Sequence, residues 1–337
     1  MSTIGRAMVL VFGIGLAGFP GGGHAEDPEG PAVVASIGPV HSLVAAVMAG
    51  VGEPTLLVKG AASPHTASLR PSEAAALQRA DVVFWVGEDL ETFLRKPLSA
   101  LPDRAEVVAL ASAPGVRLLP AREGDDWGEH AHADEHGHAE EHGDEHGHDH
   151  GDDAKEDGAG GHGAEEAADM HVWLDPENAR AMAGAAAAAL TKVDPERAEI
   201  YAANAKALNQ RLDGLDAELR GLLAPVADKP YIVFHDAYQY FENRYGLSPA
   251  GAITFSPERA PGARTLSEIR ERIKSSGAVC VFREPQFEPD LVKTVVAGSS
   301  ARVGVLDPIG ADIAPGPDAY PTLLTRLGSS LSDCLGR

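Results

Sequence analysis

The chain has 337 residues, which allows two lobes with separate hydrophobic cores or one large domain. Its formal net charge is −22, but the segment from Arg122 to Asp169 holds 18 Asp and Glu against one Arg and one Lys, which leaves only −6 for the rest. The body of the protein is therefore mildly acidic, and the lack of a basic stripe excludes nucleic acid as a partner.

The N-terminus has the pattern of an export signal. Arg6 precedes an apolar run from Ala7 to Phe19, and Gly23-His24-Ala25 resembles a small-residue cleavage site. The apolar run is shorter than the roughly 20 residues that a membrane-spanning helix needs. We therefore predict that residues 1–25 are a signal peptide and that the mature, exported chain begins at Glu26.

Residues 26–193 are predicted to form an N-terminal α/β lobe. Apolar runs of strand length alternate with helical patterns, which is typical of βαβ units with a parallel sheet. Strands are expected at residues 32–37, 55–58, 81–86 and 106–110, and helices at about 41–49, from 71 onward and at 177–190.

A long helix, residues 194–224, is predicted to link this lobe to a second one. Asp194-Pro195-Glu196 is typical of a helix start, and apolar residues recur at helical spacing as far as Leu223. Residues 225–337 form the expected C-terminal lobe, with strands at 231–234, 252–255, 278–282 and 302–306 and helices at 265–275 and 289–297. Each lobe is thus expected to be a mostly parallel four-stranded sheet flanked by helices.

A His-rich acidic loop, residues 122–169, is predicted to be inserted in the N-terminal lobe without regular structure. It contains nine of the 14 histidines of the chain. Neutral imidazole is the commonest side-chain ligand of transition metals, and short His-rich tracts are typical of metal binding. The alternative is a solvating insert whose histidines have no specific role.

Four further candidate ligands lie in loops, and three of them follow predicted strands. His235 and Asp307 each come directly after a strand, His65 follows a strand by a short loop, and His171 comes just after the His-rich loop. Ligand sites of parallel sheets lie beyond the carboxyl ends of the strands. Three imidazoles and one carboxylate suit the four tetrahedral ligands of zinc, whereas manganese prefers more oxygen ligands. Taken singly, each histidine is weak evidence, because most loop histidines are solvated or hydrogen-bonded.

The chain has two cysteines, Cys280 and Cys334. An even count in an exported protein predicts one disulfide, which would tie a C-terminal strand to the last helix. Two buried free thiols are the alternative. Neither cysteine belongs to a C-x-x-C pair, so a cysteine zinc site or a redox motif is not expected.

Several motifs together resemble a known family. These are SPHTASLRPS from Ser63, LQRADVV from Leu77, HVWLDP from His171, FHDAYQYF from Phe234 and LDPIG from Leu306. In this order they are similar to the motifs of the cluster A-I solute-binding proteins of metal ABC importers, over essentially the whole mature chain. The acidic His-rich insert and the histidine at position 235 resemble the zinc-specific, ZnuA-type members.

The resemblance implies a periplasmic zinc receptor whose site lies between two lobes joined by a rigid helix. It implies His65, His171 and His235 as the zinc ligands and Asp307 at the fourth family position, where water or another carboxylate is the alternative. The two cysteines are placed like the C-terminal disulfide of zinc-type members. Glu284, after a strand, is expected to orient a ligand imidazole.

The implied function is capture of Zn²⁺ in the cleft and delivery to a membrane permease, with the His-rich loop as a low-affinity collector. We expect a monomer that is not an enzyme and that receives zinc either directly or from another periplasmic zinc donor. Two other functions remain open at this stage. A zinc-dependent hydrolase would use the three histidines with an open water position, and a zinc buffer or chaperone would act through the His-rich loop alone.

Overall fold

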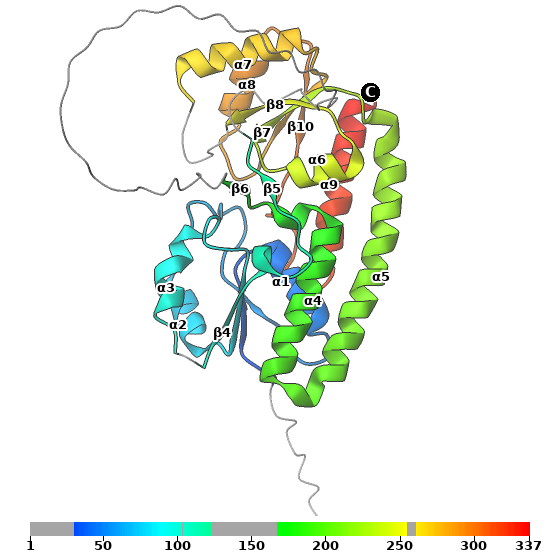
Figure 1. Ribbon diagram of the computed structural model, residues 1–337. Coiled ribbons are helices and arrows are strands. Elements are labelled where there is room, and N and C mark those ends of the chain that lie inside the picture. The colour runs from blue at the N-terminus through cyan, green and yellow to red at the C-terminus, as the bar shows by residue number, and fades with distance from the viewer. Residues whose placement is uncertain (1–29, 103, 123–166, 255–260) are drawn as a thin grey trace, which may run out of the picture.

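The protein folds into two α/β lobes, one above the other, as the computed structural model shows (Figure 1). The structure describes residues 30–102, 104–122, 167–254 and 261–337. The predicted signal peptide and most of the His-rich loop lie outside these residues. None of the helices in the described ranges combines the length and apolar character that a membrane span requires.

The N-terminal lobe is built on a four-stranded sheet in the order β2-β1-β3-β4, and all of its pairings are parallel. Buried apolar runs form the two inner strands, as expected for a sheet covered on both faces, whereas the two edge strands are partly exposed. The strands are β1 (Val33–Ala35), β2 (Thr55–Leu56), β3 (Val82–Trp85) and β4 (Glu106–Ala109). The helices are α1 (Gly38–Val47), α2 (Pro71–Arg79), α3 (Arg95–Ser99) and α4 (Pro176–Val193), with 3₁₀ turns at Thr92–Leu94, Leu110–Ser112 and Val172–Leu174.

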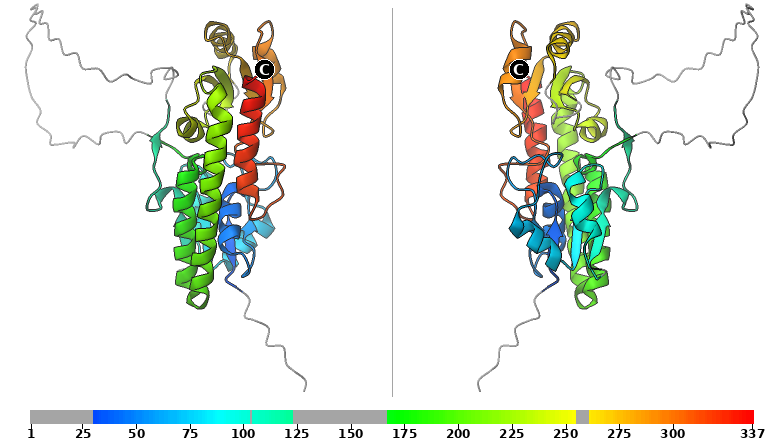
Figure 2. Two further views of the ribbon diagram at one scale, coloured as in Figure 1. Left: turned by 90° about the vertical axis from the view of Figure 1, so that its right-hand side faces the viewer. Right: turned by 90° about the vertical axis from the view of Figure 1, so that its left-hand side faces the viewer.

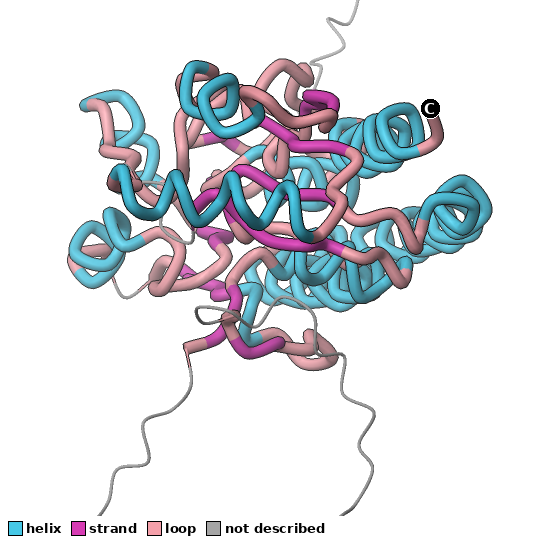
Figure 3. The backbone as a smooth tube through the Cα atoms, turned by 90° about the horizontal axis from the view of Figure 1, so that it is seen from above, coloured by secondary structure: helices cyan, strands magenta, loops and turns pink. Residues whose placement is uncertain are grey.

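The C-terminal lobe repeats this plan with a parallel sheet in the order β10-β9-β7-β8. Seen from above, its strands lie between helices (Figure 3). The strands are β7 (Tyr231–His235), β8 (Pro249–Thr254), β9 (Cys280–Arg283) and β10 (Arg302–Val305). The helices are α6 (Gln239–Tyr245), α7 (Ala263–Ser275) and α8 (Asp290–Val296). The prediction of two parallel four-stranded sheets flanked by helices is confirmed.

The predicted linking helix is α5 (Ala198–Leu223), with 3₁₀ turns before it at Pro195–Arg197 and after it at Ala224–Val226. Its buried face joins one hydrophobic core that includes residues of both lobes. Ile200 and Leu222 share the helical spacing of the apolar residues, but they are 42% and 38% exposed and lie outside this core. The helix therefore packs along both lobes through a narrower stripe than the sequence pattern covers.

A second helix, α9 (Ala319–Leu335), also contacts both lobes and runs beside α5 (Figure 2). At its start, the backbone N–H of Tyr320 donates to the hydroxyl of Ser42 on α1. At its other end, Cys334 forms a disulfide with Cys280 on β9. At Gly328, a Cβ atom would lie only 2.4 Å from a methyl group of Leu219, so the glycine permits close approach of the two helices. The predicted disulfide is confirmed, and it fastens this second bridging helix.

The two ends of the His-rich loop are joined by a short antiparallel ribbon, β5 (Leu119–Pro120) with β6 (Ala168–Asp169). The ribbon lies against the C-terminal lobe, because the Tyr240 hydroxyl on α6 accepts from the N–H of Leu119 and donates to the carbonyl of Asp169. The partly buried Arg122 adds ion pairs of 2.9 Å to Asp236 and 2.7 Å to Glu242. The loop thus leaves the body of the protein between the two lobes.

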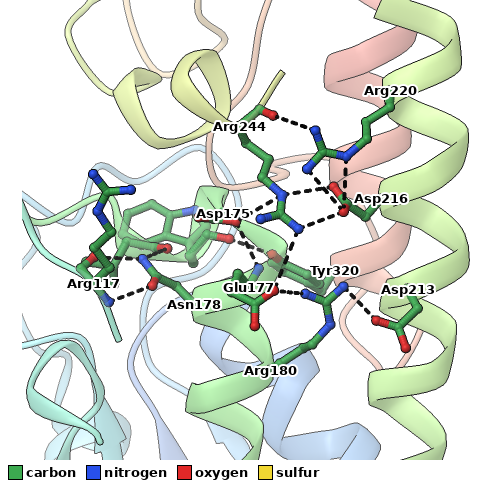
Figure 4. Close-up of polar contacts among 12 residues, drawn as sticks. Arg117, Asp175, Glu177, Asn178, Arg180, Asp213, Asp216, Arg220, Arg244 and Tyr320 are labelled. Atoms are coloured by element: carbon green, nitrogen blue, oxygen red, sulfur yellow. Dashed lines mark hydrogen bonds and ion pairs between the residues drawn. The ribbon is translucent and has the colours of Figure 1, made fainter. Parts of the chain in front are cut away.

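A polar group that we call the interlobe cluster joins α6 to α4 and α5 (Figure 4). It comprises Asp175, Glu177, Asp216, Arg220 and Arg244. The Arg244 guanidinium lies 2.6 Å from the Asp216 carboxylate and 3.6 Å from those of Asp175 and Glu177. The hydrogen bond with Asp216 raises the pKa of Arg244. One arginine of the C-terminal lobe thus contacts the linking helix and the start of α4.

We expect Arg244→Met to lower the free energy of unfolding of the metal-free protein by about 2–3 kcal/mol, at or below the lower end of the range for breaking a buried ion pair. Asp216 would lose its principal partner while its side chain is only 12% exposed. Urea unfolding would measure the loss. Arg220→Met is the matched control, because Arg220 contacts the same carboxylate but is 51% exposed, and we expect a loss below about 1 kcal/mol. Equal losses of unfolding free energy in the two variants would contradict the prediction that Arg244 is the principal partner of Asp216.

Candidate metal centre

Three histidines from separate elements meet between the lobes. His65 lies in the turn after β2, His171 lies directly before the turn Val172–Leu174, and His235 is the last residue of β7. One ring nitrogen of each lies within 4.8 Å of the others, and the ring centroids are 5.2 to 5.7 Å apart. The structure therefore brings together three of the four predicted ligands.

Carboxylates set the direction of two of these rings. The Nδ1 atom of His171 lies 2.7 Å from an oxygen of Asp169, and the Nδ1 atom of His235 lies 2.8 Å from Glu284. A carboxylate accepts at these distances, so Nδ1 carries the proton and the Nε2 lone pair is left for a ligand. The two Nε2 atoms are 3.3 Å apart. Two nitrogens of a tetrahedral zinc site with bonds of about 2.0–2.1 Å are separated by roughly 3.3–3.4 Å.

The loop that carries His171 is held by the other lobe and by α9. The indole N–H of Trp173 donates to the carbonyl of Pro308 at 2.8 Å, and the Tyr320 hydroxyl donates to the carbonyl of Trp173 at 2.6 Å. Both side chains are fully buried. These two bonds place His171 opposite His235 without any contribution from a metal.

His65 completes the group from the N-terminal lobe. Its backbone N–H donates to the hydroxyl of Ser63, and its Nε2 atom is buried without a hydrogen-bonding partner among the described residues. Burial, followed by repulsion from His171 and His235, lowers the pKa of His65 to about 3. The neutral imidazole that a metal requires is therefore the form that His65 has at neutral pH.

We expect the metal-free protein to lose stability as the pH falls from about 6.5 to about 3. In the unfolded chain, His65 binds a proton near pH 6.5, whereas the folded protein binds it only near pH 3. The unfolded state holds more protons between these values, so this group lowers the unfolding free energy by up to about 1.4 kcal/mol per pH unit. Urea unfolding at several pH values should show a shallower pH slope for His65→Gln than for the unchanged chain. Identical slopes would contradict the lowered pKa.

The walls of the site are largely apolar. Besides the three histidines, Glu284 and Gln286, the cavity is lined by Ser63, Pro64, Trp173, Phe287, Pro308 and Ile309. Its volume of about 10 Å³ is roughly the room that one water molecule needs. The free space between the three nitrogens is therefore about the size of a single small ion or water molecule.

Asp307 lies outside the group of three histidines. Its carboxylate accepts from the backbone N–H groups of Ile309, Gly310 and Ala311 and from the side-chain amide of Gln286. Both oxygens are thus bound within the protein. Direct coordination by Asp307 stays a prediction that these contacts do not favour.

Of the two carboxylates that bind the histidines, one was predicted from the sequence and the other was not. The predicted contact of Glu284 with one of the three imidazoles is confirmed, since its carboxylate accepts from Nδ1 of His235. The composition of the chain places Asp169 at the end of the predicted unstructured loop, so the sequence does not predict it as the partner of His171. A signal was present, since Asp169 precedes His171 by two residues and its carboxylate also accepts the backbone N–H of His171.

Comparison with known proteins agrees with this geometry. The model of the ZnuA family, described as the periplasmic component A of a zinc-uptake complex, matches residues 33–334. The chain is 53% identical over 330 residues to the high-affinity zinc uptake system protein ZnuA of Brucella suis biovar 1 (strain 1330), with 96% of each chain covered. It is 39% identical to the protein of that name from Paracoccus denitrificans (strain Pd 1222), over 98% of both. The structure of a periplasmic zinc-binding protein, TroA from Treponema pallidum, shares the fold, with a TM-score of 0.72, 21% identity and coverage of 91% of this chain and 100% of that one.

Two α/β lobes, a helix along both, and three histidines between them define a two-lobed solute-binding protein with an interlobe site suited to a metal. With the family model matched over nearly all of the described chain, the protein belongs to the ZnuA family.

Proposed function

We propose that this protein is a high-affinity zinc receptor that captures Zn²⁺ between its lobes through His65, His171 and His235. It then delivers the ion to the membrane permease of an ABC importer. The observation that carries the proposal is the convergence of three imidazoles, with two Nε2 atoms already at a separation that suits tetrahedral zinc.

The relatives support the same conclusion. The curated proteins that match the chain over almost its full length are named as zinc uptake system proteins, and the family model describes a periplasmic component. A periplasmic location is in keeping with the export signal predicted at residues 1–25. The family is one of receptors, so the hydrolase and the zinc buffer are not the favoured functions.

The His-rich loop is proposed to collect zinc weakly and to raise its concentration beside the site. The ribbon that closes the loop ends at Asp169, which is the hydrogen-bonding partner of His171. Ions held along the loop would thus be released close to the tight site, which is an effect of local concentration. The loop is not required for tight binding in this proposal.

The test is to titrate zinc into a protein that lacks the loop, with manganese as competitor. Leu119 pairs with Asp169 and Pro120 with Ala168, and a hairpin that extends this register would set position 122 opposite position 166. Replacing residues 123–165 with Asn-Gly would therefore provide a two-residue hairpin turn that suits this register. The variant keeps Arg122, whose ion pairs hold the ribbon against the C-terminal lobe, and Asp169, whose carboxylate binds His171.

We expect calorimetry at neutral pH to show one tight zinc site in the loop-replaced protein that excess manganese does not displace. Loss of all tight binding in this variant, with binding kept in the full chain, would move the function into the loop and support the buffer. Turnover of ester, peptide or phosphate substrates by the zinc-loaded protein would instead support the hydrolase.

A further inference from the structure

The carboxylate of Asp307 is held rigidly just after β10. It accepts the backbone N–H of Ile309 at 3.1 Å, of Gly310 at 3.0 Å and of Ala311 at 2.6 Å. The same carboxylate accepts the side-chain amide of Gln286 at 2.7 Å. Three backbone donors thus fix the position of the acceptor to which Gln286 is bound.

This contact determines which way the amide of Gln286 faces. A carboxylate with four donors around it accepts, so the NH₂ end of Gln286 must point to Asp307 and its oxygen must lie at the other end. That oxygen, Oε1, is buried and has no hydrogen-bonding partner among the described residues. An unpaired buried acceptor costs about 1–3 kcal/mol, so a donor is expected to reach it.

Gln286 also lines the small cavity that contains the three histidines. The neighbouring walls from Phe287, Pro308 and Ile309 offer no side-chain donor, and the hydroxyl of Ser63, which also lines the cavity, makes no hydrogen bond to Gln286. The carboxylate of Glu284 is an acceptor that binds His235 and the hydroxyl of Tyr238. The cavity measures only about 10 Å³, so a fourth ligand beside a bound ion has to be small. A water bound to a zinc ion is a strong donor, because the ion polarises its O–H bonds.

We propose that Gln286 accepts a hydrogen bond from a water molecule that is the fourth zinc ligand, and that Asp307 positions Gln286 for this contact. The inference rests on the proposed zinc-binding function, and it gives the carboxylate of Asp307 an indirect role at the zinc site. Asp307 acts through the amide instead of coordinating the ion. Because the amide is neutral, it adds no negative charge to that of the carboxylates of Asp169 and Glu284, which suits an ion that must later be released.

The first test asks whether water is a ligand. The EPR signal of the Co²⁺-loaded protein is recorded in ordinary water and in water enriched in ¹⁷O. Broadening in the ¹⁷O sample is the expected result, since a bound oxygen nucleus with spin would couple to the metal. No broadening would overturn the proposal, because the fourth ligand would then be a protein oxygen such as that of Asp307 or Gln286.

The second test asks whether Gln286 and Asp307 act together. We expect Gln286→Leu to lower zinc affinity 10- to 100-fold, the usual effect of removing a partner outside the ligand set. Asp307→Ala should cause a loss of similar size. The double variant should lose no more than Gln286→Leu alone, because Asp307 acts only through Gln286. Additive losses, or an affinity of Gln286→Leu within twofold of the unchanged chain, would overturn the proposal.

Controls separate this inference from the proposed function. Thermal melting of each metal-free variant shows whether it folds, and Gln286→Ala replaces Gln286→Leu if the leucine is not accommodated. Tight zinc binding by the unchanged chain together with unaffected variants would remove only the inference. Absence of tight zinc binding by the unchanged chain would remove the proposed function as well.

Discussion

We expect His235→Ala to lower zinc affinity by roughly 100- to 1,000-fold. A four-ligand zinc site in a small protein contributes about 10–16 kcal/mol of binding free energy, so one ligand is worth roughly 3–4 kcal/mol. Each 1.4 kcal/mol corresponds to a factor of ten. His235 is only 3% exposed, and its removal also leaves the buried Glu284 with fewer partners. Competition with a chelator of known affinity would measure the loss.

The matched control for this experiment is another buried histidine, His41. Its Nε2 atom lies 2.9 Å from the carbonyl of Pro54, which is a structural contact within the N-terminal lobe. His41→Gln keeps a donor for that carbonyl, so zinc affinity should stay within about twofold. A loss of less than tenfold in His235→Ala would mean that the tight site lies elsewhere.

The disulfide accounts for the second large effect. Replacing Cys280 and Cys334 together with alanine should lower the free energy of unfolding by about 4 kcal/mol, because the bond closes a loop with a sequence separation of 54 residues in the unfolded chain. In the folded protein the bond fastens the end of α9 to β9, and α9 packs on both lobes. Urea unfolding of the metal-free variant would measure the loss.

Two control measurements test whether the loss of stability comes from the disulfide bond itself. The unchanged chain treated with a reductant should show a similar loss, since only the bond and not the side-chain volume is then altered. Zinc affinity should change little, because neither cysteine lines the histidine cavity. A loss below about 1 kcal/mol would show that the unfolded chain is already compact around this pair.

The secondary structure and the lobe architecture were accessible from the sequence because their signals are local. Buried apolar runs such as Val82–Trp85 and the helical spacing of α5 depend on neighbouring residues, and the structure confirms them within a few positions. His235 illustrates the limit of this accuracy, since it is the last residue of β7 instead of the first residue after it.

The roles of α9 and of the ribbon were not accessible in the same way. Nothing in the spacing of residues 319–335 indicates that Tyr320 bonds to Ser42 and Trp173, which lie far away in the chain. The ribbon pairs two-residue strands on either side of the His-rich loop, and such short segments carry no periodic pattern.

Two α/β lobes, a long linking helix and one disulfide were predictable from the sequence, and so were the three histidines that the structure brings together. These depend on local periodicity, on cysteine number and on motifs read in order along the chain. The tertiary structure was needed to show that Glu284 binds His235 in particular, that Asp169 binds His171, and that Asp307 binds Gln286 and a backbone turn. The physical reason is that hydrogen-bond partners are chosen by packing between distant segments, and a single sequence carries no record of which buried donor will meet which acceptor.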